Sequence, residues 1–196
     1  MESDYSEIYR LEPEEFDWLD LASEFFKHDG SFSYGIERNG DVIRHGKRYD
    51  EIEREYDQLN SIHELVPEHT VEPLMSIYRR VDGKRKMAGF YMEKEDGALM
   101  KDYLRDSKDV HENLAIVKDI ERTVRKMHEN GVVHGDLANN IFYDGESWKM
   151  FDPVGEPYSE DGYDKMRRCD LEDIEVLEAK AKAPFGDLME EASDVF

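Results

Sequence analysis

The run from Val132 to Gly155, VVHGDLANNIFYDGESWKMFDPVG, constrains this 196-residue chain more than any other segment. An apolar pair leads into a loop that contains Asp136, and two short apolar segments then flank an Asp144-Gly145 turn. This pattern predicts a loop followed by a β-hairpin. Because a hairpin returns its two ends to the same neighbourhood, we expect Asn140 and Asp152 to lie close together.

These residue types suit phosphoryl transfer from ATP. That reaction needs a carboxylate to orient or deprotonate the acceptor hydroxyl, and oxygen ligands to hold Mg²⁺ on the phosphates. Asp136 offers the carboxylate, and Asn140 and Asp152 offer ligands of the kind that magnesium prefers. The competing interpretation is that they are ordinary turn formers between strands. The amphipathic helix predicted before the loop and the Asp at the end of the hairpin favour the catalytic interpretation.

The sequence here resembles the protein-kinase-like superfamily: HGDL is similar to the catalytic loop H-R-D-L-x-x-x-N, and FDPVG stands where D-F-G is expected. It is most similar to the small atypical types, namely RIO kinases, the KEOPS kinase subunit and aminoglycoside phosphotransferases. The resemblance implies that Asp136 is the catalytic base, that Asn140 and Asp152 hold Mg²⁺, and that His134 braces the loop. In the family the Asn follows the Asp by five residues, a position occupied here by Ile141. Either the loop is one residue shorter, which favours Asn140, or Asn139 takes the metal role.

The first half of the chain supplies counterparts for the nucleotide-binding parts of the family. Gly30, Ser31 and Gly35 match a degenerate glycine-rich phosphate loop, although a helix stop before a strand explains them equally well. The resemblance places Arg44 at the strand cation that holds the phosphates, with Lys47 as the alternative. Glu55, in an E-x-x-x-L pattern, is the helix carboxylate that would position that cation, although a surface role in so acidic a helix is the alternative.

Two further segments are similar to family elements. The stretch FYMEKEDGAL resembles the hinge, where the resemblance implies that main-chain groups from Met92 through Glu93 to Glu95 meet the adenine. The segment CDLEDIEVLE resembles the helix that braces the catalytic loop, and implies that Asp173 holds loop N–H groups. The alternative is that Asp173 is a first-turn acid behind the helix N-cap Asp170.

Periodicity and turn residues predict the remaining elements. We expect helices over 13–26, 49–65, 100–104, 113–130 and 171–181, hairpins over 31–46 and 74–93, and short strands at NIFY and WKMF. The fold class is therefore α+β. The resemblance implies a bilobal protein-kinase-like fold, with an N-terminal extension (1–29), a small β-rich lobe with one helix (30–94), a minimal, mostly helical lobe (95–181) and a tail (182–196).

Composition restricts the partners and the compartment. The chain has 48 acidic and 26 basic residues, a formal charge of -22, which disfavours general binding to nucleic acid or anionic membrane and suits a cationic partner or a high-salt cytoplasm. Cys169 is the only cysteine, so no intrachain disulfide forms. With no signal-peptide pattern and no long apolar run, the expected location is the cytoplasm. The predicted N-terminal helix is a candidate surface for a protein partner.

Two classes of function remain open. Only about twenty residues separate Asp152 from Asp173, and no A-P-E motif occurs, which disfavours regulated kinases that dock peptides on an activation segment. The first class is an ATP- and Mg²⁺-dependent phosphotransferase acting on a protein or small-molecule hydroxyl, or an ATPase coupled to a partner. The second is a pseudokinase that binds nucleotide or acts as a scaffold. Retention of Asp136 and Asp152 favours the enzyme, whereas Arg44 and the short loop favour the scaffold.

Overall fold

The computed structural model describes residues 28–29, 33–38, 41–46, 49–95, 97–155, 157 and 159–182, with side chains described from residue 50 onward except at 79 and 80. The predicted helix over 13–26, Gly30, Ser31, Lys47 and the Asn39-Gly40 turn lie outside the described residues. The chain forms two compact units, Met1–Glu53 with Leu74–Lys94, and Arg54–Pro73 with Glu95–Phe196. Within the described residues, no helix is both long and apolar enough to cross a membrane.

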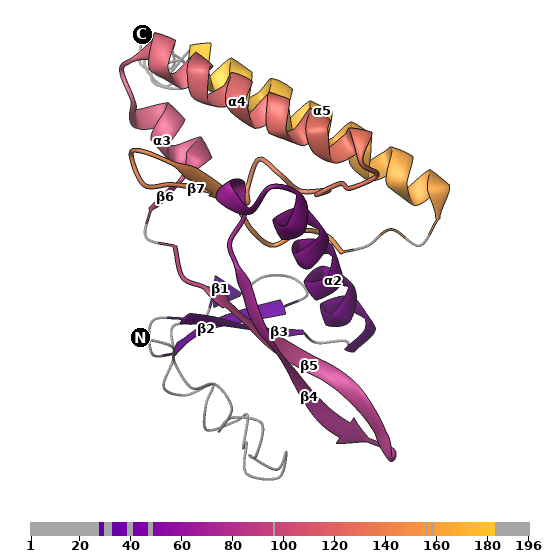
Figure 1. The fold of residues 1–196 in the computed structure, drawn as a ribbon. Coiled ribbons are helices and arrows are strands. Elements are labelled where there is room, and N and C mark those ends of the chain that lie inside the picture. The colour runs from indigo at the N-terminus through magenta and orange to yellow at the C-terminus, as the bar shows by residue number, and fades with distance from the viewer. Residues whose placement is uncertain are drawn as a thin grey trace, which may run out of the picture. The chain divides into compact units, whose positions relative to one another are not determined.

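The first unit is built on an antiparallel sheet (Figure 1). Its strands are β1 (His28–Asp29), β2 (Ser33–Arg38), β3 (Asp41–Gly46), β4 (Pro73–Val81) and β5 (Lys84–Glu93), in the order β1-β2-β3-β5-β4. The predicted turn between β4 and β5 is confirmed, because Asp82 and Gly83 both adopt positive φ, 51° and 76°, as a tight hairpin turn requires. Met75 and Tyr91 pack together with Leu74 and Ile77 on this sheet.

Helix α2 (Tyr49–Leu65) has the predicted bounds, and a short 3-10 turn, η2 (Pro67–His69), follows it. From Arg54 on, α2 belongs to the second unit. Ile62 and Val66 enter the core of that unit, and the backbone N–H of Val71 donates to the carbonyl of Met150. The segment after α2 is thereby attached to the second unit's sheet.

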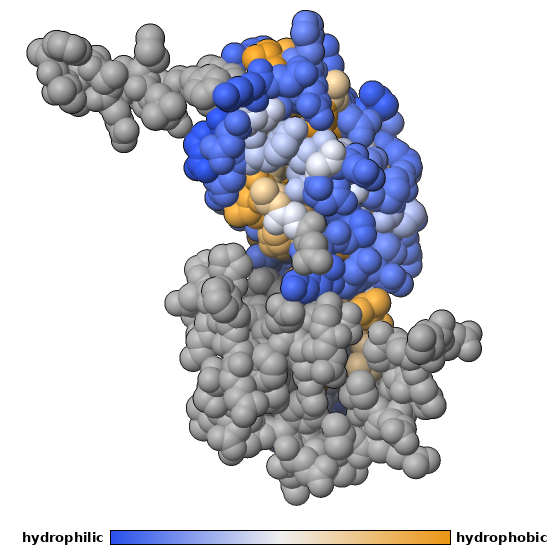
Figure 2. Space-filling model, turned by 90° about the vertical axis from the view of Figure 1, so that its left-hand side faces the viewer, coloured by the Kyte–Doolittle hydropathy of each residue, from blue (hydrophilic) through white to orange (hydrophobic). Residues whose placement is uncertain are grey.

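The second unit combines a three-stranded antiparallel sheet with long helices. Strands β6 (Ala98–Leu99), β7 (Ile141–Tyr143) and β8 (Trp148–Met150) pair in the order β6-β7-β8. Helices α3 (Met100–Asp106), α4 (Val110–Glu129) and α5 (Glu160–Lys182) surround one hydrophobic core, and α4 and α5 run alongside each other (Figure 1). The core includes Leu137 and Ile141, so it anchors the second half of the loop between α4 and β7 and the start of β7. Figure 2 shows one face of this unit, and the described surface there is mostly hydrophilic.

The α+β, kinase-like fold class is confirmed, with corrections at helix ends. Helix α4 begins at Val110 rather than Asn113, because the Asp109 side chain caps it by accepting from the N–H of Glu112 at 3.0 Å. Helix α5 begins at Glu160, eleven residues before the predicted start, so Asp170 lies inside the helix and the N-cap prediction was wrong. The first turns of α5 lack apolar periodicity and contain Gly162. They are held instead by tertiary contacts such as the Tyr163 hydroxyl, which donates to the carbonyl of His128 at 2.9 Å.

Candidate active site

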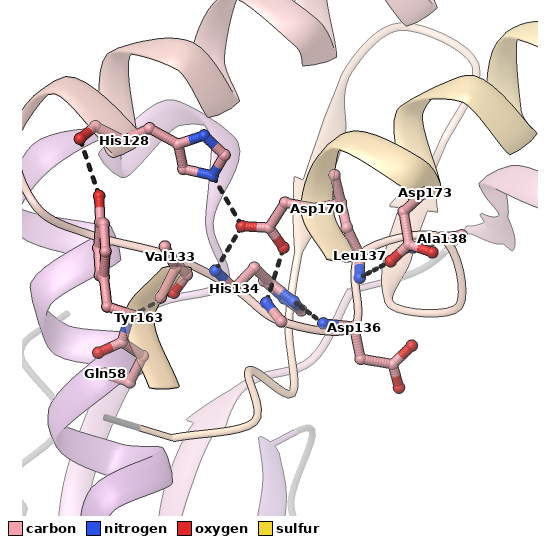
Figure 3. A network of polar contacts seen from close by, with 11 residues as sticks. Gln58, His128, Val133, His134, Asp136, Leu137, Ala138, Tyr163, Asp170 and Asp173 are labelled. Atoms are coloured by element: carbon pink, nitrogen blue, oxygen red, sulfur yellow. Dashed lines mark hydrogen bonds and ion pairs between the residues drawn. The ribbon is translucent and has the colours of Figure 1, made fainter. Parts of the chain in front are cut away.

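The loop from His134 to Asn140, called here the catalytic loop, is held from behind by two carboxylates of α5 (Figure 3). Asp170 accepts hydrogen bonds from the backbone N–H groups of His134 and Gly135, at 3.0 and 2.7 Å. Asp173 accepts from the N–H groups of Leu137 and Ala138, the first at 2.6 Å and the second at 3.1 Å. Four N–H groups of the loop backbone are therefore satisfied by one helix face, because residues three apart on a helix lie side by side. The bracing contacts expected of Asp173 are confirmed.

Asp170 is completely buried and has a third partner, His128 Nε2 at 2.9 Å. Because a carboxylate only accepts, that nitrogen carries a proton. Burying a carboxylate is costly unless its oxygens receive hydrogen bonds, and here both oxygens do. His128 lies in the last turn of α4, so this contact joins α4, α5 and the catalytic loop. Burial raises the pKa of Tyr163, whose hydroxyl donates to the carbonyl of the same His128.

His134 ties the catalytic loop to the end of the hairpin. Its Nε2 lies 2.8 Å from the carbonyl oxygen of Phe151, so Nε2 is the protonated nitrogen. Nδ1 then accepts from the backbone N–H of Asp136 at 3.4 Å, and the backbone carbonyl of His134 accepts from Val154 N–H at 2.9 Å. With no exposed surface, the ring braces the loop as expected.

Gly135 is required by the backbone and by close packing. Its φ is 89°, and a Cβ at this position would lie 2.8 Å from the Met166 methyl carbon and 3.1 Å from Val154. A residue with a side chain would therefore be strained at this φ and would displace Met166 and Val154. This accounts for Gly at the second position of HGDL.

The Asp136 side chain is half-buried and points away from Asp170 and Asp173 in Figure 3. One of its oxygens accepts from Asn139 Nδ2 at 3.1 Å. The backbone carbonyl of Asp136 accepts from Asn140 Nδ2 at 2.8 Å. The loop thus presents one carboxylate outward from a backbone that is held at nearly every residue.

The hairpin brings Asn140 and Asp152 together as predicted from the sequence. Ile141 pairs with Met150, and the backbone N–H of Phe151 donates to the carbonyl of Asn140 at 3.0 Å. Asp152 follows directly, with φ of 56°, a left-handed conformation that is strained for a residue with a side chain and that clusters at functional sites. The hairpin turn is held by Asp144, whose carboxylate accepts from Ser147 and Glu146 N–H and from the Ser147 hydroxyl, and these hydrogen bonds lower its pKa.

This end of the hairpin suits a magnesium ion shared with phosphates. Asn140 Nδ2 donates to the backbone carbonyl of Asp136, which identifies the other end of the amide as the acceptor, Oδ1. This Oδ1 accepts no hydrogen bond from any described residue. Asn139, by contrast, uses both ends of its amide within the protein. No cluster of three or more His, Cys, Asp or Glu side chains with metal-binding geometry occurs among the described residues, so any ion here would take its remaining ligands from phosphates and water.

Helix α2 meets this site at Arg54, Glu55 and Gln58. Gln58 is buried, and its Nε2 donates to the carbonyl of Val133, just before the catalytic loop. Gly155 has φ of 97°, and a Cβ there would lie 3.1 Å from the backbone nitrogen of Glu55. Glu55 is itself buried, as its place in the predicted E-x-x-x-L pattern requires. The loop after Asp152 therefore packs directly on the α2 backbone at Glu55.

The other predicted nucleotide-binding residues that the structure describes lie on the first unit's sheet, except Glu95. Gly35 on β2 pairs with Arg44 on β3, and Arg44 pairs with Phe90 on β5; the Arg44 side chain lies outside the described residues. Met92 is buried on β5, and Glu93 is the last residue of that strand. Glu95 lies in the second unit and forms a salt bridge with Lys149. The expected cation–Glu55 pair stays a prediction.

Four residues that hold the catalytic loop were not predicted from the sequence: Asp170, Gln58, His128 and Lys101. The last of these donates from Nζ to Asn139 Oδ1 at 3.0 Å. The available signal was the spacing of Asp170 and Asp173, which places two acids on one helical face. The partners of these residues are 35 to 75 positions distant in the chain, and no local pattern reveals them.

Comparison with known proteins agrees with this geometry. The sequence profile of the lipopolysaccharide kinase (Kdo/WaaP) family matches residues 39–151, more than half of the chain. No curated protein sequence matches significantly. Among solved structures, the kinase domain of Mycobacterium tuberculosis PknI is similar, with a TM-score of 0.53 and 19% identity over 78% of this chain and 67% of that one. A mutant of the same domain gives a TM-score of 0.54 and 17% identity over 81% and 72%. These structural likenesses establish the fold.

Proposed function

Because this chain belongs to the lipopolysaccharide kinase (Kdo/WaaP) family, we propose that it transfers the γ-phosphate of ATP, with Mg²⁺, to a hydroxyl group of an acceptor molecule. The observation that supports this most strongly is the catalytic loop. Asp136 is directed outward by a backbone that Asp170 and Asp173 hold, beside the hairpin end that carries Asn140 and Asp152.

In this proposal Asp136 is the base. One carboxylate oxygen of Asp136 accepts a hydrogen bond from Asn139 Nδ2. The other receives the proton of the acceptor hydroxyl while the hydroxyl oxygen attacks the γ-phosphorus. The bond between the γ-phosphorus and the β,γ-bridging oxygen breaks, and ADP leaves. A carboxylate in this role contributes about 10²–10⁴-fold to the rate.

Asn140 Oδ1 and the Asp152 carboxylate would hold Mg²⁺, which neutralises charge on the phosphates when it is bound. The commitment of Asn140 Nδ2 to the Asp136 carbonyl supports Asn140 rather than Asn139 as the ligand. Glu55 is buried, and the loop that follows Asp152 packs on its backbone. As the resemblance implies, its carboxylate would position a phosphate-binding cation, for which Arg44 and Lys47 are the candidates. Main-chain groups at Met92, Glu93 and Glu95 would meet the adenine, and Gly30, Ser31 and Gly35 the phosphates.

The family description names lipopolysaccharide, so a saccharide hydroxyl is the first acceptor to test. The experiment is calorimetric titration of ATP with and without Mg²⁺. Transfer assays with γ-labelled ATP then follow on free sugars, a purified lipopolysaccharide and a generic protein substrate. Mg²⁺-strengthened binding and Asp136-dependent labelling of one acceptor class support the proposal. Folded protein that binds no nucleotide in either condition would overturn it and favour the scaffold alternative.

A further inference from the structure

A lysine from another element reaches the proposed base through one amide. Lys101, the second residue of α3, donates from Nζ to Asn139 Oδ1 at 3.0 Å. Asn139 donates from Nδ2 to Asp136 Oδ1 at 3.1 Å. The three side chains form a continuous line of hydrogen bonds from α3 to the catalytic loop.

The position of Lys101 is fixed by the fold. Its neighbour Met100 and, one turn on, Leu104 are fully buried in the core of the second unit. The strand before it, β6, pairs with β7 at Leu99 and Phe142, and β7 follows the catalytic loop directly. The start of α3 and the end of the loop therefore belong to one packed structure, and the lysine reaches the loop from a rigid base.

The chemistry of the two ends determines the orientation of the amide. An ammonium group only donates hydrogen bonds and a carboxylate only accepts them. Asn139 must therefore direct Oδ1 to Lys101 and Nδ2 to Asp136. Either end alone favours this orientation, and the ammonium adds to the preference because it holds Oδ1 toward Lys101 and away from the Asp136 carboxylate.

The loop itself has no lysine or arginine that could act on Asp136 in place of Lys101. No Lys or Arg occurs between Val132 and Ser147, so the loop has no cation of its own. Asp136 is flanked by Gly135 and Leu137, and Ala138 offers only a methyl group. Among the described residues, Asn139 is the one side chain whose hydrogen bond to the Asp136 carboxylate is identified, and Lys101 is the charge behind it.

We propose that Lys101 is a positioning residue that acts on Asp136 through Asn139. It fixes the amide orientation, so that one carboxylate oxygen is occupied and the other faces the acceptor hydroxyl. This inference rests on the proposed function of Asp136. It assigns Lys101 no contact with ATP, so the affinity for nucleotide does not depend on it.

The test compares Lys101→Met, Lys101→Arg, Asn139→Leu and the double variant Lys101→Met/Asn139→Leu in the full chain, with Lys118→Met, an exposed lysine on α4, as the matched control. The activity measured is phosphate release from Mg-ATP, with Asp136→Asn as the baseline.

We expect Lys101→Met to lower kcat roughly tenfold with KM for ATP unchanged, because misorientation of Asp136 affects the chemical step. Arginine restores most of the rate. In the Asn139→Leu background the Lys101 change has no further effect, as coupled residues require.

A second measurement is independent of turnover. The side-chain amide resonances of Asn139, assigned by their loss in Asn139→Leu, shift in Lys101→Met and stay unchanged in Lys118→Met. Unshifted resonances in Lys101→Met, or full kcat in that variant while Asp136→Asn is impaired, would overturn the role of Lys101 alone. Undiminished phosphate release in Asp136→Asn would instead overturn the proposed function, and this inference with it.

Discussion

Asn140 Nδ2 donates a 2.8 Å hydrogen bond to the backbone carbonyl of Asp136, four residues earlier. This contact closes the short loop on itself and leaves the amide oxygen of Asn140 as an acceptor at the end of the hairpin. A loop one residue shorter than in the kinases that the sequence resembles therefore still ends on an oriented amide. The consequences of this arrangement can be measured.

Replacing Asp136 by Asn should lower phosphoryl transfer about 10²–10⁴-fold while ATP binding is kept, because the amide preserves shape but accepts no proton. Turnover and calorimetric affinity measured on the same protein separate the two effects. Asp161→Asn, an exposed acid on α5, is the matched control and should leave both unchanged. Equal turnover in the wild type and Asp136→Asn would remove Asp136 from the chemical step.

Asn140→Ala and Asp152→Ala should each weaken Mg²⁺-dependent ATP binding by roughly tenfold or more, about 1.4 kcal/mol, while binding without Mg²⁺ changes little. Asn139→Ala should leave the Mg²⁺ dependence intact, because its amide is used within the protein. Titration with and without Mg²⁺ measures this directly. If Asn139→Ala alone removed the magnesium effect, the metal assignment would move to Asn139.

Asp170→Ala should destabilise the fold by about 3 kcal/mol, since removing a buried carboxylate leaves its hydrogen-bond partners without an acceptor. Those partners are His128 and the N–H groups of His134 and Gly135. Urea unfolding followed by circular dichroism gives the free energy. Glu175→Ala, exposed on the same helix, serves as the control, and a cost equal to the control's would contradict the anchoring role.

Gly155→Ala should destabilise the protein more than Gly145→Ala. Both glycines have positive φ, 97° and 103°, so both variants carry a backbone strain of about 1–2 kcal/mol. Only at Gly155 would the new Cβ meet backbone, 3.1 Å from Glu55 N, whereas nothing lies within 4 Å at Gly145. Thermal unfolding of the two variants side by side isolates the contact. Equal losses would show that the loop after Asp152 does not depend on close packing against α2.

Asp144→Asn should destabilise the hairpin in a manner that depends on pH. Hydrogen bonds from Ser147 and Glu146 lower the pKa of the folded Asp144 carboxyl below its ordinary value of about 3.9. The charged form therefore contributes stability that is fully present above that value and is lost as the pH falls through the folded pKa. The difference in Tm between the wild type and Asp144→Asn should be constant from pH 7 to 5 and shrink below about pH 4. A difference that grew on acidification would contradict this sign.

Local pattern was sufficient for much of the fold. The bounds of α2 follow from its apolar face and from Pro67, and the turns at Asp82-Gly83 and Asp144-Gly145 follow from residues that tolerate positive φ. Interactions between residues a few positions apart determine such features, so they can be predicted from the sequence. The proximity of Asn140 and Asp152 also follows, because a short hairpin leaves their segments no other arrangement.

The start of α5 was mispredicted for the opposite reason. Its first turns carry little apolar pattern and become helical where Tyr163 meets His128 and Met166 lies beside Gly135. Asp170 looked like a helix cap because an acid before an apolar run usually accepts from the N–H groups of the first helical turn. The folded chain supplied stronger partners from the catalytic loop.

The sequence by itself identified the residues on which the proposed chemistry depends: an Asp in a loop after HG, an Asn and an Asp at the two ends of a hairpin, and the order of helices and strands around them. Tertiary structure alone decided how those groups are held, through the carboxylates of Asp170 and Asp173 behind the loop and the Lys101–Asn139 contact beside Asp136. The division has a physical cause. Backbone preferences and turns depend on neighbouring residues, whereas a buried carboxylate or a side-chain amide takes its partner from whatever the packed core brings within 3 Å.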